Sequence, residues 1–222
     1  MAAPSVVEPA PRWEGGSFGP ISTGTARGTV LSRCGVGVGM SRFDLVRGVS
    51  AVRVRARTNL NAVTMTATDV VGDLDAEMTP NGVFLAVPVP GCRVEVPVAA
   101  LHSGNPLYDR EGRRRFDAAH YPAVVAELVM AIPLGRGKHR VTWRLTLHGA
   151  THDLDGELQA GAIDADAIMV EGRHRLDVRR WGVHPGGFLG IHVNPEADFS
   201  VRLLGRRRAT STPTDREFLT SP

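Results

Sequence analysis

Residues 140–149 read RVTWRLTLHG, and every second side chain in this run is apolar. Val141, Trp143, Leu145 and Leu147 alternate with polar or charged residues, which is the period of a β-strand with one apolar and one solvated face. A strand of this kind belongs in an antiparallel sheet whose apolar side covers a core. The run therefore predicts a half-buried strand and an antiparallel sheet.

The same alternation recurs on both sides of this run. Further strands are predicted at residues 50–58, 69–78, 83–89, 92–98, 123–133, 151–160, 168–170, 172–180 and 199–205. Eight or more strands that share one apolar face favour closure into a barrel, because closure removes exposed sheet edges. The prediction is an all-β, antiparallel barrel of about eight strands, and a sandwich of two sheets is the alternative.

One segment does not alternate, namely residues 103–122, SGNPLYDREGRRRFDAAHYP. Asp109 is a candidate N-cap, and the chain from there can make about two or three helical turns before Pro122 ends them. Phe116 and Ala119 would share one face of that helix. The segment predicts one short helix inserted between strands near residues 109–120, and we hypothesise that it is a lid over one end of the barrel.

Composition limits the kind of protein. The net charge of the 222 residues is only +3, which is too small an excess to favour a nucleic-acid partner. Cys34 and Cys92 have no CxxC neighbours, so a zinc or redox motif is absent. No signal-peptide pattern is seen, and no run approaches the ~18 apolar residues of a membrane span. We expect a soluble, cytoplasmic protein without a cofactor.

Three regions differ in composition. Residues 1–40 are rich in Gly, Pro, Ser and Thr and predict a flexible arm. Residues 41–205 hold the alternating strands and predict the barrel domain. Residues 206–222 are polar and predict a disordered tail.

Four motifs occur in the order that one known family shows. They are residues 50–57, residues 101–105 followed by 114–117 and 121–122, residues 144–151, and residues 177–183. The second includes a Tyr-Pro that opens the next strand, and the third reads RLTLHGAT. With these motifs the chain resembles the YceI-like family of lipid-binding proteins. It departs from the family pattern at Trp143, where a small residue is usual, at Trp181, where Phe is usual, and at Arg180, where Asp is usual.

The resemblance implies a lipocalin-like barrel with a helical insertion, and a long apolar ligand, a polyisoprenoid or related lipid, bound inside it. The physics agrees, because an eight-stranded barrel has room for side chains or for one slender ligand. Each buried CH₂ contributes about 0.8 kcal/mol. A chain of about twenty carbons would then reach micromolar affinity after the cost of association. A barrel filled by its own side chains is the alternative.

The apolar parity of the predicted strands supplies the candidate cavity lining. These residues are Val52, Val54, Ala56, Leu85, Val87, Val94, Val96, Val124, Ala126, Leu128, Trp143, Leu145, Leu147, Leu176, Val178, Phe199 and Val201. Arg113, Arg114, Arg115 and Phe116 on the inserted helix are candidates for a head-group or lid site. For the three arginines, a solvated helix surface is the alternative.

An enzyme that acts on an apolar substrate in the same cavity, through converging His and Asp residues, is the alternative function. Ser103 is a candidate nucleophile, with a turn hydrogen bond as the simpler explanation. His148 and His152 flank a predicted turn, which makes a metal pair unfavourable. A third possibility is a partner-binding module that uses the Gly-rich arm. No metal site or catalytic residue is predicted, and homodimer formation is left open.

Overall fold

The computed structural model describes residues 39–85, 92–188 and 190–208. Its strands are β1 (Ser41–Leu45), β2 (Ala51–Thr58), β3 (Ala62–Ala67), β4 (Val71–Thr79), β5 (Gly82–Leu85), β6 (Cys92–Pro97), β7 (Ala123–Gly135), β8 (Lys138–Leu147), β9 (Ala150–Asp164), β10 (Ala167–Asp177), β11 (Gly187–Phe188) and β12 (Ile191–Arg207). Its helices are α1 (Pro106–Arg115) and the short 3-10 turns η1 (Val98–Ala100) and η2 (Val178–Trp181).

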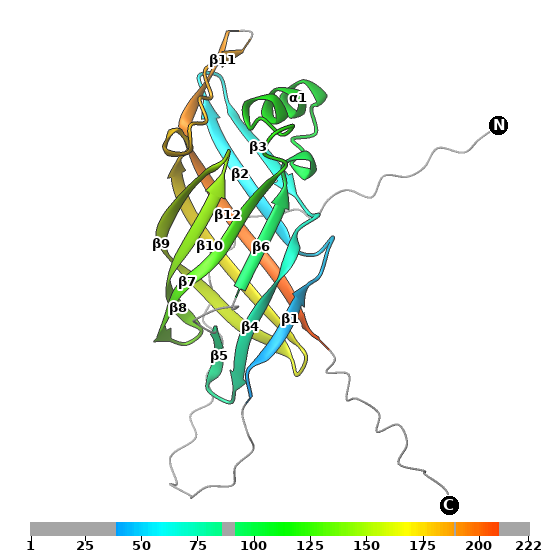
Figure 1. Cartoon of the computed structure of the whole chain (residues 1–222), viewed down its shortest axis with the longest axis vertical. Helices are drawn as coiled ribbons and strands as arrows, with labels where there is room; N and C mark the ends of the chain where they lie inside the picture. Colours follow the sequence, from blue (N-terminus) through cyan, green and yellow to red (C-terminus); the bar gives the residue numbers. More distant parts are fainter. Residues whose placement is uncertain (1–38, 86–91, 189, 209–222) are drawn as a thin grey trace, which may run out of the picture. The chain divides into compact units, whose positions relative to one another are not determined.

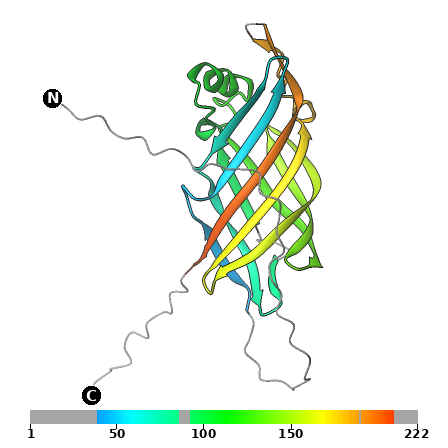
Figure 2. The same cartoon turned by 180° about the vertical axis from the view of Figure 1, so that it is seen from behind.

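The strands form a closed antiparallel barrel (Figures 1 and 2). The ring runs β1-β4-β6-β7-β8-β9-β10-β12, and β12 closes it by pairing with β1. The long β12 pairs with β1 near its C-terminal end and with β2 over residues 193–202, and β3 continues the sheet from β2. The predicted all-β, lipocalin-like barrel with one inserted helix is confirmed.

Side-chain alternation explains why these residues form the barrel wall. In β6, Cys92 and Val94 are buried while Arg93 between them is exposed. In β8, Leu145 and Leu147 are buried and Arg144 is exposed. The apolar parity of these two strands thus faces the interior, and their charged parity faces solvent.

The interior is packed by two clusters of buried side chains. One includes Phe43, Leu74 and Ile168, each fully buried, and these three side chains meet over Gly205 of β12. A Cβ added at Gly205 would lie 2.9 Å from Cβ of Phe43, so only glycine fits there. The other cluster gathers around Trp181 of η2.

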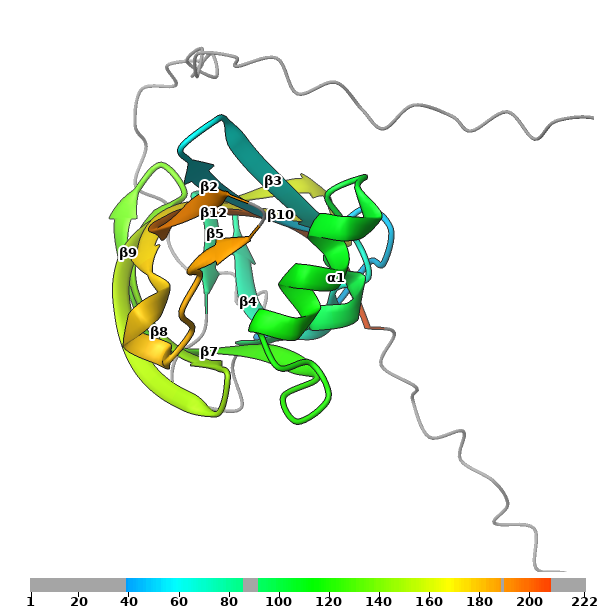
Figure 3. The same cartoon turned by 90° about the horizontal axis from the view of Figure 1, so that it is seen from above.

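The inserted helix begins earlier than predicted. Asn105 is the N-cap, since its side chain accepts a hydrogen bond from the Leu107 N–H, and Pro106 occupies the first turn. The predicted cap, Asp109, lies inside the first turn, and Phe116 is the C-cap, so Ala119 is outside the helix. Figure 3 shows α1 beside β3 at one end of the barrel.

Several strands differ from the prediction. The strands β1, β3 and β11 were not predicted, and β12 is more than twice as long as the predicted 199–205. The predicted strands 168–170 and 172–180 are one strand, β10, which ends at Asp177 where η2 begins. The strand predicted at 83–89 is described only to Leu85, and the predicted arm lies outside the described residues except for positions 39 and 40. Of the predicted tail, residues 206–208 are described, and Arg206 and Arg207 belong to β12.

Candidate functional site: an apolar cavity in the barrel

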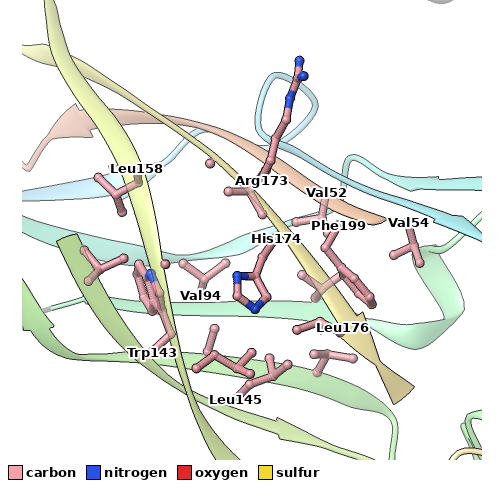
Figure 4. A pocket seen from close by; sticks show the side chains of 18 of the residues that line it. Val52, Val54, Val94, Trp143, Leu145, Leu158, Arg173, His174, Leu176 and Phe199 are labelled. Atoms are coloured by element: carbon pink, nitrogen blue, oxygen red, sulfur yellow. The ribbon is translucent and has the colours of Figure 1, made fainter. Parts of the chain in front are cut away.

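A cavity of about 180 Å³ lies inside the barrel. Figure 4 shows its wall, where side chains from β2, β6, β8, β9, β10 and β12 converge. The apolar lining residues are Val52, Val54, Val94, Val96, Leu101, Phe116, Val124, Ala126, Val141, Trp143, Leu145, Leu147, Leu154, Leu158, Val170, Leu176, Phe199, Val201 and Leu203. The barrel is therefore hollow over part of its length and packed elsewhere.

Most of the predicted lining residues border this cavity. The structure brings together Val52, Val54, Val94, Val96, Val124, Ala126, Trp143, Leu145, Leu147, Leu176, Phe199 and Val201, and it adds Phe116 from the end of α1. Their role in binding a ligand stays a prediction. Period-2 alternation found them because inward-facing positions on neighbouring strands lie at similar heights in a closed barrel.

Other predicted lining residues do not border the cavity. Leu85 and Leu128 are buried in the cluster that contains Phe43, and Val178 is buried in the cluster around Trp181. Ala56 shares the parity of Val52 and Val54 in β2 but lies away from the cavity. Val87 lies outside the described residues. Parity identifies the inner face of a strand, but neighbouring side chains decide which inner positions are packed.

Sequence reasoning missed part of the wall. Val141 and Val170 lie in predicted strands on the apolar parity, so the signal was present. Leu154 and Leu158 of β9 also show period-2 spacing. Gly172 showed no apolar alternation, because a glycine has no side chain and its presence in a sequence usually indicates a turn or a bulge.

Two polar groups face the otherwise apolar interior. In Figure 4 the Trp143 indole and the His174 imidazole point among the aliphatic side chains, while Arg173 points away from them. Neither ring has a hydrogen-bond partner among the residues that the structure describes. Asp155 and Glu157, which also border the cavity, are exposed. The inward-facing polar atoms are thus an indole N–H and an imidazole.

The predicted head-group arginines are largely engaged within the protein. Arg114 and Arg115 both pair with Glu111, and Arg115 also donates to the backbone oxygens of His184 (2.7 Å) and Gly187 (3.1 Å). None of the three predicted arginines borders the cavity. Arg113 has no side-chain ion pair within the described ranges, so a head-group role stays a prediction chiefly for Arg113.

Ser103 is held as part of a turn. Its hydroxyl donates to Oδ1 of Asp109 at 2.6 Å, its N–H donates to the same oxygen at 2.7 Å, and Nδ1 of His102 lies 3.4 Å from Oδ2. Burial acts to raise the pKa of Asp109, but these hydrogen bonds outweigh it and leave the pKa below its usual range. The carboxylate stands between hydroxyl and imidazole, so the imidazole is not placed to take the Ser103 proton.

His148 in the β8–β9 turn and His152 in β9 also serve the fold. Nδ1 of His148 lies 3.2 Å from the backbone oxygen of Trp181, and Nε2 of His152 lies 2.8 Å from that of Arg180. Both imidazoles therefore tether η2 to this end of the barrel. Within residues 39–85, 92–188 and 190–208, no three His, Cys, Asp or Glu side chains gather as a metal site would require.

We expect acid to loosen α1 through Glu111. Hydrogen bonds and charge from Arg114 and Arg115 lower the pKa of Glu111 from 4.5 to about 2. Because the pKa of Glu111 is lower in the folded state than in the unfolded chain, the ionised carboxylate stabilises the fold at pH values above about 4.5. This contribution is lost as the pH falls from about 4.5 towards 2. Thermal unfolding midpoints measured across this range should fall, and Glu111→Gln should flatten the dependence. An equally steep fall in the variant would contradict the assignment.

Comparisons with known proteins agree with this geometry. A model described as YceI-like domain matches residues 43–203, and no curated protein matches the chain. A polyisoprenoid binding domain from Saccharophagus degradans, implicated in plant cell wall breakdown, is 13% identical with a TM-score of 0.60, over 77% of this chain and 100% of that one. Burkholderia cenocepacia BcnA is 17% identical with a TM-score of 0.59, and the match covers 75% of this chain and 100% of BcnA. The Campylobacter jejuni YCEI protein is 12% identical, with a TM-score of 0.53 over 84% and 94%.

The fold and the cavity define a closed antiparallel β-barrel with a hollow, apolar interior. Since the family model covers most of the chain, the protein belongs to the YceI-like family. The solved structures share its fold. No helix in the described part of the chain is long and apolar enough to cross a membrane.

Proposed function

We propose that this protein binds an apolar ligand, a polyisoprenoid or a related lipid, in the barrel interior, and that it carries or stores this ligand. The observation that supports the proposal is the cavity, whose inward-facing wall is aliphatic and aromatic apart from His174 and the indole N–H of Trp143. Burial of a hydrocarbon against such a wall is favourable by about 0.8 kcal/mol for each CH₂. The polyisoprenoid binding domain of the same fold supports the ligand class.

The cavity volume limits how much ligand is enclosed. A cavity of about 180 Å³ is close to the ~150 Å³ of an engineered apolar cavity that binds benzene, and below the ~300–1,000 Å³ of sites for larger ligands. The cavity would not entirely enclose a chain of about twenty carbons, the ligand length considered from the sequence. We therefore propose that a short isoprenoid, or one segment of a longer chain, occupies the cavity.

An enzyme in the same cavity has less support. Among the described histidines, His174 borders the cavity, while Asp155 and Glu157 beside it have exposed side chains. A base without a partnering carboxylate or nucleophile does not make an acid–base pair. A cytoplasmic location and dimer formation stay predictions.

Trp143 is expected to set the length of the preferred ligand. Its indole occupies the cavity wall where a small residue is usual in the family, and Trp143→Ala should enlarge the space. We expect the variant to bind geranylgeraniol about tenfold more tightly relative to geraniol than the natural protein does, because about two more CH₂ groups would be buried. Titrations of geraniol, farnesol and geranylgeraniol, followed by native mass spectrometry, measure this preference.

Trp181→Phe is the matched control, because Trp181 is buried in the second cluster and does not border the cavity. It should leave the preference among the three alcohols unchanged. No binding of any of the three by the natural protein would overturn the proposed function. If Trp143→Ala bound the three alcohols with the same relative affinities as the natural protein, Trp143 would not set the length of the preferred ligand.

A further inference from the structure

The strands β9 and β10 separate partway along the barrel. Their pairing runs from Asp164 and Ala167 to its last pair, Leu158 and Gly172. Beyond that pair, residues 150–157 of β9 remain paired with β8, and residues 173–177 of β10 remain paired with β12. Among the described residues the two facing strand edges therefore have no ladder partner there, and their backbone N–H and C=O groups are available to another molecule.

The separation is bounded at both ends. At one end the ladder closes at Leu158 and Gly172. At the other end, η2 returns to β9, where His152 bonds the backbone oxygen of Arg180 and its ring packs edge-on against Trp181 at 5.1 Å. We call the opening between residues 153–157 and residues 173–176 the β9–β10 window.

The cavity reaches this window. Asp155, Glu157 and Arg173 are exposed residues on the outer parity of their strands, yet all three border the cavity. A cavity enclosed behind a continuous ladder would be bordered by the inner parity alone. At the inner position, Gly156 leaves the wall thin, since a Cβ there would already lie 3.4 Å from Nδ1 of His174.

His174 supplies a polar contact at this place. Its imidazole points into the cavity (Figure 4) and has no hydrogen-bond partner in the described part of the chain. An imidazole can donate a hydrogen bond to a carbonyl or hydroxyl oxygen, or accept one from a hydroxyl group. Asp153 and Arg175 at the window edges pair with Arg144 and Asp198 in the neighbouring strands. The remaining edge charges are Asp155 and Glu157 on β9 and Arg173 on β10, so both signs are present and the window does not match a ligand of a single charge.

On the basis of the proposed function, we infer that the ligand enters through the β9–β10 window and carries a neutral oxygen group that His174 binds there. The apolar part of the ligand then lies along the aliphatic wall. The ligand class is thus an isoprenoid or lipid alcohol or ketone rather than a pure hydrocarbon or a phosphate ester.

The oxygen contact is tested with farnesol and with farnesene, its hydrocarbon counterpart. His174→Phe should weaken farnesol binding about three- to tenfold, the worth of one net hydrogen bond, and should leave farnesene binding unchanged or tighter. His184→Phe, on an exposed histidine away from the cavity, should change neither. Equal losses for both probes, or no loss for farnesol, would overturn the role of His174.

The entry route is tested by a disulfide across the window. Glu157→Cys with Arg173→Cys, in a Cys34→Ser, Cys92→Ala background, continues the register of Leu158 and Gly172. Oxidation should slow farnesol exchange at least about tenfold, and a reductant should restore it. Gly156→Leu, which fills the window from within, should slow exchange without any disulfide.

The matched control joins α1 to β3 with a short bifunctional thiol crosslinker through Gly112→Cys and Met65→Cys, since the Met65 side chain reaches to 2.8 Å from the place of a Cβ at Gly112. This link should leave exchange unchanged. Slower exchange with the α1 link, together with normal exchange in both window variants, would move the entry to the helix end and overturn the inference. Failure of the natural protein to bind either probe would instead overturn the proposed function, so the two failures are distinguishable.

Discussion

Ala126→Phe combined with Val201→Phe is expected to lower the affinity for farnesol at least about a hundredfold while the barrel stays folded. The two residues line the cavity from β7 and β12, which lie four strands apart in the ring and so face each other across the interior. Two added rings would exclude about four CH₂ groups of ligand, or about 3 kcal/mol. Native mass spectrometry and calorimetric titration measure the loss.

The control for this pair places the same rings outside. Val125→Phe with Ser200→Phe changes the adjacent residues in the same strands, which alternation directs away from the cavity. Both double variants need a thermal unfolding curve, because overpacking can cost about 1–3 kcal/mol. Undiminished binding by the folded, filled barrel would show that the ligand binds elsewhere.

Trp181→Ala should produce the largest loss of stability among single substitutions in η2, about 3–5 kcal/mol in the free energy of unfolding. The Trp181 side chain is 1% exposed, and its indole N–H donates to the backbone oxygen of Leu145 at 3.1 Å. The ring fills the cluster formed with Leu147, Leu176 and Val183, so its removal leaves a cavity and loses the hydrogen bond to Leu145.

Trp143→Ala gives the comparison for this effect. Trp143 borders space that is already empty, and its indole N–H has no partner among the described residues. Its removal should cost less than about 2 kcal/mol: the half-buried ring packs against the cluster that contains Phe43, but it also faces empty space and no hydrogen bond is lost. Urea unfolding of the two variants measures both values. Equal losses would mean that the ring of Trp143 is packed as tightly as that of Trp181.

The barrel could be predicted from the sequence because its strands alternate so regularly. The strand β8 is the clearest case, where four apolar side chains point inward in one run. The first half of β12 was missed because Pro195 lies within it, and proline argues against a strand. Its pairing with β2 shifts register between Val193 and Ala197, and an irregularity of this kind is where a strand accommodates proline.

The helix start was also readable but was placed too late. Asn105 followed by Pro106 is a capping residue followed by the residue preferred at the first helical position. The N-cap was instead predicted at Asp109, where the charged run begins, four residues after the true N-cap. Asp109 instead accepts hydrogen bonds from the N–H and the hydroxyl of Ser103, ahead of the helix. These contacts depend on the folded geometry of the segment.

The hollow part of the site could be predicted only in outline. Alternation gave the inner parity, but the choice between packed and empty depends on how neighbouring strands are staggered. Leu128 and Leu145 share that parity, yet Leu128 is packed by its neighbours and does not border the cavity, while Leu145 borders it. The β9–β10 window depends on where a ladder ends, and Leu158 and Gly172 carry no sequence signal for that.

The most direct test of a ligand-binding barrel is native mass spectrometry of the gently purified protein, followed by solvent extraction of whatever it retains. We expect one apolar, oxygen-bearing isoprenoid or lipid in each barrel, and its loss from the Ala126→Phe, Val201→Phe variant. A bare protein that takes up no added isoprenoid, or equal loading of the filled variant, would contradict it.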